Sequence, residues 1–212
     1  MDRMVKTKKM KENEKTEKLR RIKEMVLNCR KCELFKERMR NNFFPVIGEG
    51  NHNAEIIFCG EAPGLNEAKT GKPFCGEAGI VLDNLLNCIN LKREDVYICN
   101  LLKCRPPKNR DPKKEEIYAC SPFLSSQIDI INPKIICPLG RYSMRFIFEK
   151  YNIKENRTIS MIHGKVYKIR TLLKSLTILP LYHPAVGVYN PNMIEVMKKD
   201  FETLKKLKSE LN

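Results

Sequence analysis

Four of the nine cysteines lie among charged residues, where burial in an apolar core does not account for them. Cys29 and Cys32 form a Cys-x2-Cys pair, and Cys104 and Cys120 form a second pair with a much wider spacing. Two thiolates at Cys-x2-Cys spacing can bind one metal, and two distant cysteines can complete a tetrahedral set. Zinc ribbons usually combine two close pairs, whereas iron–sulfur clusters tolerate wide spacing because each iron takes one cysteine. The pattern predicts a structural metal site and leaves iron and zinc open.

A second unusual segment is the loop "GEAPGLNEAKTGKPFCG", residues 60–76, which follows a short apolar run. It lacks the G-x4-G-K-[ST] order of a phosphate loop, and Glu61 would repel a phosphate. Glu61 and Glu67 alone are too few carboxylates for a hard metal ion. A flat, neutral ligand fits better, because backbone amides can bind its carbonyl oxygens, Phe74 can stack on its ring and a carboxylate can act beside it.

Short apolar runs alternate with amphipathic segments of helical period along the chain. This alternation predicts an α/β fold with a mainly parallel sheet and helices on both faces. Ligands of such folds bind at the carboxyl ends of the strands, where residues 60–76, 100–110 and 182–190 are expected to meet. The expected strands are residues 54–60, 95–100, 133–140, 165–169 and 176–185, and the expected helices are residues 17–29, 77–90, 113–131, 141–151 and 192–211.

The remaining segments carry charge rather than periodicity. Residues 1–15 are charged and aperiodic, which predicts a flexible basic tail before a single domain over residues 16–212. Residues 30–53 are expected to be loop-rich.

Of the other cysteines, four occupy apolar runs and are expected to be buried, while Cys75 stays ambiguous; the four are Cys59, Cys88, Cys99 and Cys137.

The chain is strongly basic, with a formal net charge of +15, and residues 1–40 hold 15 Lys and Arg against 7 Asp and Glu. Such a surplus favours a polyanionic partner, nucleic acid first and an anionic membrane surface second. A lysine-rich solvated surface is the alternative. No apolar run approaches the ~18 residues of a membrane span, and the N-terminus lacks the apolar region of a secretory signal. We therefore expect a soluble, cytoplasmic and nucleoid-associated protein without disulfides.

Four stretches together resemble the family 4 uracil-DNA glycosylases, the iron–sulfur type, from about Cys29 to the C-terminus. The stretches are "GEAPGLNEAKTGKPFCGEAG", "VYICNLLKCRPPKNRDP", "EEIYACSPFL" and "LYHPA". The resemblance implies a three-layer αβα fold with a small, mainly parallel central sheet. It also implies a monofunctional hydrolase that flips uracil out of single- or double-stranded DNA, releases the free base and leaves an abasic site. The implied cofactor is a structural [4Fe-4S] cluster on Cys29, Cys32, Cys104 and Cys120, with no nucleotide cofactor, and the implied state is a monomer.

The resemblance also assigns roles to individual residues of the cleft. Phe74 would stack on uracil, Asn100 would bind N3–H and O4, and His183 would stabilise the charge that grows on O2. Glu61 would stabilise the sugar cation or orient water, although related enzymes use an aspartate one position later. Glu67 is the rival for that role, or it shapes the pocket against the methyl group of thymine. The loop residues implied to bind the substrate are Gly60, Glu61, Ala62 and Pro63.

The remaining assignments concern DNA. Arg105, Lys108 and Arg110 are expected to contact phosphates. Val186, Val188 or Tyr189 would supply the apolar wedge that fills the gap left by the flipped base, in place of the leucine and arginine usual there. The alternative functions are a catalytically inactive or product-trapping iron–sulfur DNA-binding relative and, with less support, an electron carrier.

Overall fold

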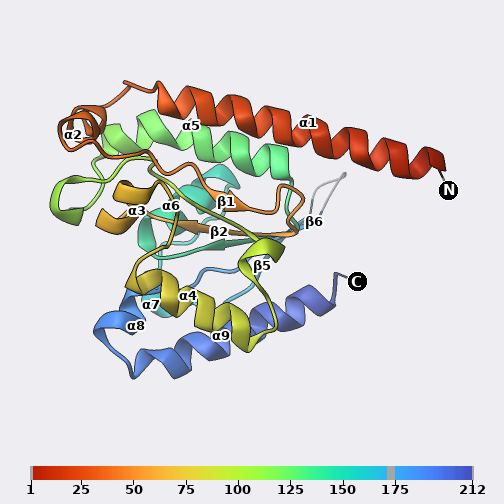
Figure 1. Ribbon diagram of the computed structural model, residues 1–212. Coiled ribbons are helices and arrows are strands. Elements are labelled where there is room, and N and C mark those ends of the chain that lie inside the picture. Colours follow the sequence, from red (N-terminus) through yellow and green to blue (C-terminus); the bar gives the residue numbers. More distant parts are fainter. Residues whose placement is uncertain (1, 171–174, 212) are drawn as a thin grey trace.

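The computed structural model describes residues 2–170 and 175–211, and its architecture is a sheet between two layers of helices (Figure 1). In the described residues the sheet has six strands in the order β1-β3-β2-β4-β6-β5. The four central strands are parallel to one another, and the edge strands β1 and β5 are antiparallel to their neighbours. The strands are β1 Glu49–Gly50, β2 Ile56–Gly60, β3 Tyr97–Asn100, β4 Ile135–Pro138, β5 Tyr167–Arg170 and β6 Ser175–Ile178.

Helices α1, α5 and α6 cover one face of the sheet, and α4 and α9 cover the other (Figure 1). Shorter helices lie in the connections at the sheet edge. The helices are α1 Asp2–Leu27, α2 Leu34–Arg40, α3 Leu65–Thr70, α4 Glu77–Cys88, α5 Lys114–Ile131, α6 Arg141–Lys150, α7 Ile159–Ile162, α8 Ala185–Tyr189 and α9 Met193–Ser209, with 3-10 turns at Arg93–Asp95 and Pro107–Asn109.

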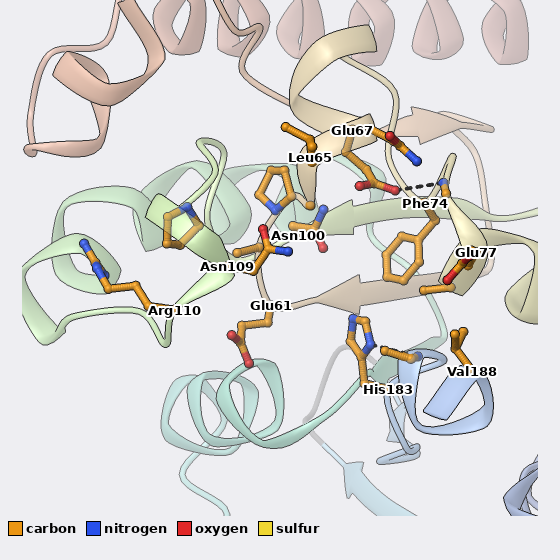
Figure 2. A pocket seen from close by; sticks show the side chains of 18 of the residues that line it. Glu61, Leu65, Glu67, Phe74, Glu77, Asn100, Asn109, Arg110, His183 and Val188 are labelled. Carbon is orange, nitrogen blue, oxygen red and sulfur yellow. Dashed lines mark hydrogen bonds between the residues drawn. The ribbon is translucent and has the colours of Figure 1, made fainter. Parts of the chain in front are cut away.

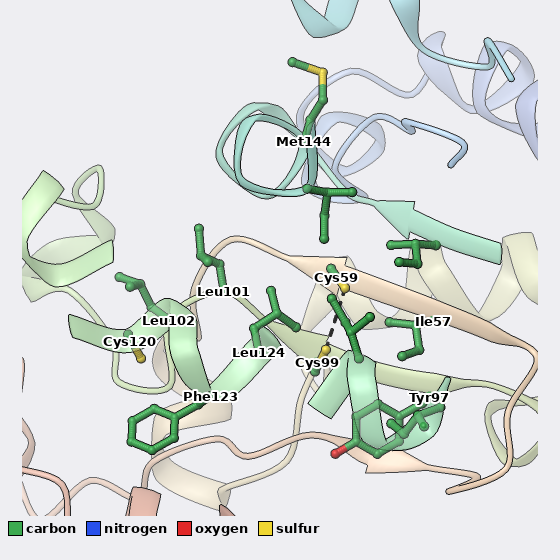
Figure 3. Packing of buried hydrophobic residues seen from close by; sticks show 14 of the residues in the cluster. Ile57, Cys59, Tyr97, Cys99, Leu101, Leu102, Cys120, Phe123, Leu124 and Met144 are labelled. Carbon is green, nitrogen blue, oxygen red and sulfur yellow. Dashed lines mark hydrogen bonds between the residues drawn. The ribbon is translucent and has the colours of Figure 1, made fainter. Parts of the chain in front are cut away.

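The central strands are apolar throughout because both faces of the sheet are buried. Along β2, Ile57 and Cys59 pack toward α5, whereas Ile56 and Phe58 pack toward α4 and α9. Figure 3 shows the α5 side, where Leu124 and its neighbours lie against the strands. The alternation divides the core into two clusters, one on each side of the sheet.

The N-terminal helix α1 packs along α5 through Leu19, Ile22 and Val26. The ammonium of Lys15 donates a hydrogen bond to the carbonyl oxygen of Ile131 at 2.9 Å, at the C-terminal end of α5. A lysine there satisfies a carbonyl that the helix leaves unpaired and interacts favourably with the helix dipole. The contacts bring the end of α1 and the Cys-x2-Cys segment onto the start of α5.

The predicted fold class is confirmed, and the five expected strands and five expected helices all occur. The short elements α2, α3, α7, α8 and β1 were not predicted, because helices of four to seven residues and a two-residue strand carry too little periodicity. Helix α1 begins at Asp2, inside the segment expected to be a flexible tail, so the backbone there is helical. The mobility of residues 1–15 and the domain boundary at residue 16 stay predictions. No described helix combines the length and apolarity needed to cross a bilayer.

Phe58 provides a test of the core on the α9 side of the sheet. It is fully buried on β2, and its ring stacks on that of Phe201 with centroids 5.9 Å apart. Phe58→Ala should lower the free energy of unfolding in urea by about 3–5 kcal/mol, since it leaves a cavity between sheet and helix. Ile80→Ala, at an exposed site on α4, is the control and should change the free energy of unfolding by less than about 1 kcal/mol. Equal effects of the two variants would contradict this packing.

Candidate active site

Three segments that are distant in the sequence meet in a cleft of about 560 Å3 at the carboxyl edge of the sheet (Figure 2). The loop after β2, the segment after β3 and the segment after β6 all contribute, as expected. Ligands bind at this edge in open α/β sheets because the loops that leave the strands diverge there. The main lining residues are Glu61, Ala62, Pro63, Leu65, Asn66, Glu67, Phe74, Glu77, Asn100, Pro106, Asn109, Arg110, His183, Ala185, Val188 and Tyr189.

Asn100, the last residue of β3, lines this cleft and carries an unsatisfied polar atom. The residue is 2% exposed, and within the described part of the chain its Oδ1 has no hydrogen-bond partner. The strand register places it beside Gly60 on β2. A Cβ at Gly60 would lie 2.2 Å from Asn100 Oδ1 and 2.7 Å from Phe74 Cζ, so only glycine leaves room for both side chains. A buried acceptor without a donor costs about 1–3 kcal/mol, which a ligand N–H can recover.

Phe74 is held in a backbone conformation that residues other than glycine rarely adopt, with φ at 49°. Arg93 fixes this turn, because its guanidinium donates to the carbonyl oxygens of Pro73, at 3.0 Å, and of Phe74. Its Nε donates to Asp83 at 2.6 Å. Gly79 is required beneath the turn, since a Cβ there would lie 1.8 Å from the carbonyl oxygen of Phe74. A strained backbone conformation that several surrounding contacts hold in place is typical of functional loops.

His183 forms the wall next to Phe74, and the two rings stack with centroids 5.6 Å apart and planes 30° apart. The backbone N–H of Ala185 donates to His183 Nδ1 at 3.2 Å, which leaves the proton of a neutral ring on Nε2. Burial lowers the pKa of His183 to about 4, and the carboxylate of Glu67 opposes that shift. The imidazole is therefore neutral at pH 7 and supplies an Nε2–H donor.

The two carboxylates of the cleft have different environments. Burial and the nearby carboxylate of Asp111 raise the pKa of Glu61 to about 7, with Arg141 opposing the shift. Glu67 instead accepts hydrogen bonds from the backbone N–H groups of Cys75 at 2.9 Å and Gly76 at 3.0 Å. It holds the turn that leads into α4. Glu61 thus has the environment of a group that titrates near neutral pH, and Glu67 has that of a loop anchor.

The structure brings most of the predicted substrate and wedge residues together, and two take other positions. Gly60 lies behind Asn100 and Phe74 rather than at the cleft surface, and Val186 does not line the cleft. Val188 does line it, and Tyr189 stands at its rim, 87% exposed. Sequence analysis missed several lining residues on the same loops, such as Leu65, Asn66 and Asn109. Their only signal was proximity to the predicted residues, because none carries distinctive chemistry.

The three basic residues expected to contact phosphates differ in how much they are engaged within the protein. The Arg110 guanidinium forms two hydrogen bonds to the buried Glu116 carboxylate, at 2.6 and 2.9 Å. Arg105 donates to Asn109 at 2.7 Å and lies over the ring of Phe43. Lys108 is exposed at a turn residue with φ at 51°. Lys108 is thus the most accessible of the three to a phosphate.

The four predicted metal ligands, Cys29, Cys32, Cys104 and Cys120, line one small cavity between α1, α2 and α5. Apolar side chains such as Val26, Leu34 and Phe123 complete its walls. Two N–H donors of the protein contact the cysteine sulfurs. The backbone N–H of Lys103 donates to Cys120 Sγ at 3.2 Å, and the buried Arg38 approaches Cys104 Sγ at 3.7 Å. Arg38 also binds the carbonyl oxygens of Val26, Leu27 and Cys29.

The arrangement of these four thiols fits a polynuclear cluster. Among the described residues no group of three or more His, Cys, Asp or Glu side chains is placed to hold a metal ion, so the fit rests on the four cysteines that line one cavity. In a cluster each iron takes one cysteine, so the sulfurs stand around a shared volume rather than a single point. N–H donors to the sulfurs are the contacts expected around ligating thiolates. The residues present therefore fit an iron–sulfur cluster.

Comparison with known proteins gives consistent matches over most of the chain. Residues 47–211 match the model of the Uracil DNA glycosylase superfamily. A Type-4 uracil-DNA glycosylase of Sulfurisphaera tokodaii is 47% identical over 191 residues, 89% of this chain and 84% of the relative. That of Saccharolobus solfataricus is 48% identical over 185 residues, 87% and 83% of the two chains. That of Archaeoglobus fulgidus is 44% identical over 182 residues, 86% and 89% of the two chains.

The protonation state of His183 gives a direct test of this geometry. Its ring signals, followed by NMR between pH 3 and 8, should titrate with a pKa of about 4 because burial disfavours the charged ring. The unfolded chain, with a His pKa of about 6.5, then binds the proton first. Between pH 6.5 and 4 this residue should therefore destabilise the fold progressively as the pH falls. Titration near 6.5 in the folded protein would contradict the buried, neutral ring.

Proposed function

The chain belongs to the Uracil DNA glycosylase superfamily, and on that premise we propose that it hydrolyses the bond between uracil and deoxyribose in DNA. The products are free uracil and an abasic site. The observation that carries the proposal is the buried Oδ1 of Asn100, which has no partner among the residues the structure describes, in a cleft walled by Phe74 and His183. Nothing in the cleft or in the relatives favours an inactive or product-trapping alternative.

Asn100 would read the hydrogen-bonding edge of the base once the nucleotide is flipped out of the duplex. Its Oδ1 accepts from N3–H of uracil, and its side-chain NH2 donates to O4. Cytosine presents the inverted pattern, with an acceptor at N3 and a donor at C4, so two buried groups would face like groups. Each unpaired group costs about 1–3 kcal/mol, which is sufficient to reject cytosine. Phe74 would stack on the face of the ring.

His183 would stabilise the leaving group as the glycosidic bond breaks. The bonding electrons move onto N1 and are delocalised onto O2 of uracil, where the Nε2–H of the neutral imidazole donates. A preorganised donor at a developing oxyanion contributes about 3–4 kcal/mol to the transition state. A neutral ring keeps this proton, and water completes the reaction by adding hydroxide to C1′ and a proton to uracil.

Glu61 would stabilise the cationic sugar or orient the water that attacks C1′. Its raised pKa supports a group that exchanges protons near neutral pH. Glu67 is bound to the backbone of Cys75 and Gly76, which supports a role in shaping the pocket rather than in activating water. The assignment of the water-activating role to Glu61 rests on this difference.

A [4Fe-4S] cluster on Cys29, Cys32, Cys104 and Cys120 is part of the proposal. When bound, it would supply structural cross-links rather than redox chemistry. The four cysteines connect the end of α1, the basic segment after β3 and helix α5. Through these connections the chain itself would hold the basic segment of Arg105 and Lys108 against DNA.

The remaining parts of the proposal concern the DNA itself. The net charge of +15 and the accessible Lys108 favour a polyanionic partner, and affinity should fall with increasing salt. The exposed ring of Tyr189 at the cleft rim is the best placed of the candidate wedges. We propose that the protein acts on uracil-containing DNA as a monomer in the cytoplasm.

An alkali assay with a uracil-containing oligonucleotide tests the function, and Asn100→Ala tests the recognition mechanism. The wild type should produce strand breaks at uracil after alkali. Asn100→Ala should reduce the single-turnover excision rate by about 10- to 100-fold, since it removes contacts of about 1–3 kcal/mol each. The affinity of the variant for uracil-free duplex should stay within about twofold of the wild-type affinity, because non-specific DNA binding is electrostatic.

Asn84→Ala, at an exposed site on α4, is the matched control and should excise uracil at the wild-type rate. Failure of the wild type to generate alkali-labile sites would sink the proposed function. Equal loss of excision and of duplex binding in Asn100→Ala would refute its role in base recognition.

The pH dependence of excision tests the role of Glu61. If the carboxylate must be ionised, the single-turnover rate should increase with pH and level off above its pKa of about 7. Glu61→Gln should be slower and should lose this increase, whereas the exposed Glu94→Gln should keep it. An unchanged pH profile in Glu61→Gln would assign the titration to another group.

A further inference from the structure

Lys103 is a buried cation that the proposed chemistry does not use. The residue is 1% exposed, and its ammonium donates to three acceptors that carry no charge. These are the carbonyl oxygen of Asn100 at 2.8 Å, the carbonyl oxygen of Ile47 at 3.2 Å and Oε1 of Gln127 at 2.6 Å. Burying a charge without a carboxylate partner is costly, and the three hydrogen bonds of the ammonium offset part of that cost.

One of these contacts reaches the residue proposed to read the base. Asn100 Oδ1 has no partner within the described part of the chain, so hydrogen bonding at that oxygen does not fix the side chain. Its position depends instead on the backbone at the end of β3 and on packing against Gly60 and Phe74. The Lys103 ammonium donates directly to the backbone carbonyl of Asn100, three residues earlier in the chain. It therefore fixes the residue from which the amide projects into the cleft.

The backbone of Lys103, in contrast to its ammonium, lies at the four-cysteine cavity. Its backbone N–H donates to Cys120 Sγ at 3.2 Å, and Lys103 itself lines that cavity next to Cys104. An iron–sulfur cluster with four thiolate ligands carries a net negative charge, which the buried ammonium would help to balance. A single residue thus contacts both the metal-ligating sulfur and the backbone of the base-reading amide.

Gln127 completes the arrangement around the ammonium. Its side-chain NH2 donates to the carbonyl oxygen of Ile47 at 2.9 Å and to the Tyr97 hydroxyl at 3.0 Å, while its Oε1 accepts from Lys103. These bonds fix the orientation of the Gln127 side chain, so that its oxygen faces Lys103. Gln127 lies on helix α5, which also carries Cys120. The network joins α5, the loop before β1 and the end of β3 through buried hydrogen bonds.

We propose that Lys103 is a positioning residue that links the four-cysteine site to the base-reading end of β3. This inference rests on the proposed uracil-DNA glycosylase function. The ammonium orients Asn100 through its carbonyl, and the backbone of Lys103 is held in place by Cys104 and Cys120. Loss of the ammonium should misplace the Asn100 amide and weaken base recognition, while the four cysteines and the DNA-binding surface remain.

The test compares Lys103→Met, which keeps the length of the side chain but not its charge, with Lys92→Met at an exposed site. Three quantities are measured: single-turnover uracil excision, inhibition by free uracil, and iron and acid-labile sulfide per chain. In Lys103→Met the excision rate should fall by about tenfold or more, on the scale of a lost charged hydrogen bond. Inhibition by free uracil should weaken in parallel. Iron content and affinity for uracil-free duplex should match the wild type.

Lys92→Met should behave as the wild type in every assay. Unchanged excision and uracil inhibition in Lys103→Met would overturn the proposal, as would a loss of excision that only follows a loss of iron. If Lys103→Met does not fold, Gln127→Met removes an acceptor of the same ammonium. It should weaken uracil inhibition with iron retained, and an unchanged inhibition constant would overturn the proposal. A wild type that releases no uracil would instead refute the underlying function.

Discussion

The structure of the cleft depends on the parallel pairing of β2 with β3, which places Gly60 opposite Asn100. That register puts the amide oxygen of Asn100, which has no hydrogen-bond partner among the described residues, beside a glycine that has no side chain to obstruct it. A shift of one residue would turn Asn100 to the other face of the sheet. Phe74 can occupy its strained turn only because Gly60 and Gly79 leave room for it and Arg93 binds its carbonyl. The shape of the cleft around Asn100 and Phe74 is therefore a consequence of strand register and of glycines at close contacts.

Burial then gives the side chains of the cleft their chemical character. His183 would be largely charged below pH 6 in water, but its enclosed ring is neutral and its Nδ1 is occupied by a backbone N–H. Glu61 is shifted in the direction that disfavours its charge, because burial and Asp111 both oppose ionisation. The protein thus presents a neutral donor and a carboxylate that titrates near neutral pH within one cleft. Lys103 extends this principle to a cation that acts through a backbone carbonyl.

Sequence reasoning predicted the fold class, the strands and the family, and the match to the Uracil DNA glycosylase superfamily confirms that resemblance. It succeeded because the strands are apolar runs, Asn100 ends one of them, and Phe74 and His183 lie in the segments that follow two others. It could not separate Glu61 from Glu67, since the burial of Glu61 and the backbone contacts of Glu67 arise only in the folded chain and neither has a local signature. The short helices α2, α3 and α8 and the 3-10 turn that carries Lys108 were missed because tertiary contacts rather than periodicity stabilise them. Lys103 lies two residues before Arg105 in a basic stretch of the sequence, and only the structure shows that it is buried.

The central claim is that the Asn100 oxygen accepts a hydrogen bond from N3–H of uracil. The most direct measurement is an NMR titration of the protein, labelled at asparagine, with free uracil and with 3-methyluracil, which lacks that hydrogen. We predict that uracil shifts the Asn100 side-chain amide signals in a saturable manner and that 3-methyluracil does not. Equal binding of both bases, or binding of uracil that leaves the Asn100 signals in place, would contradict the account.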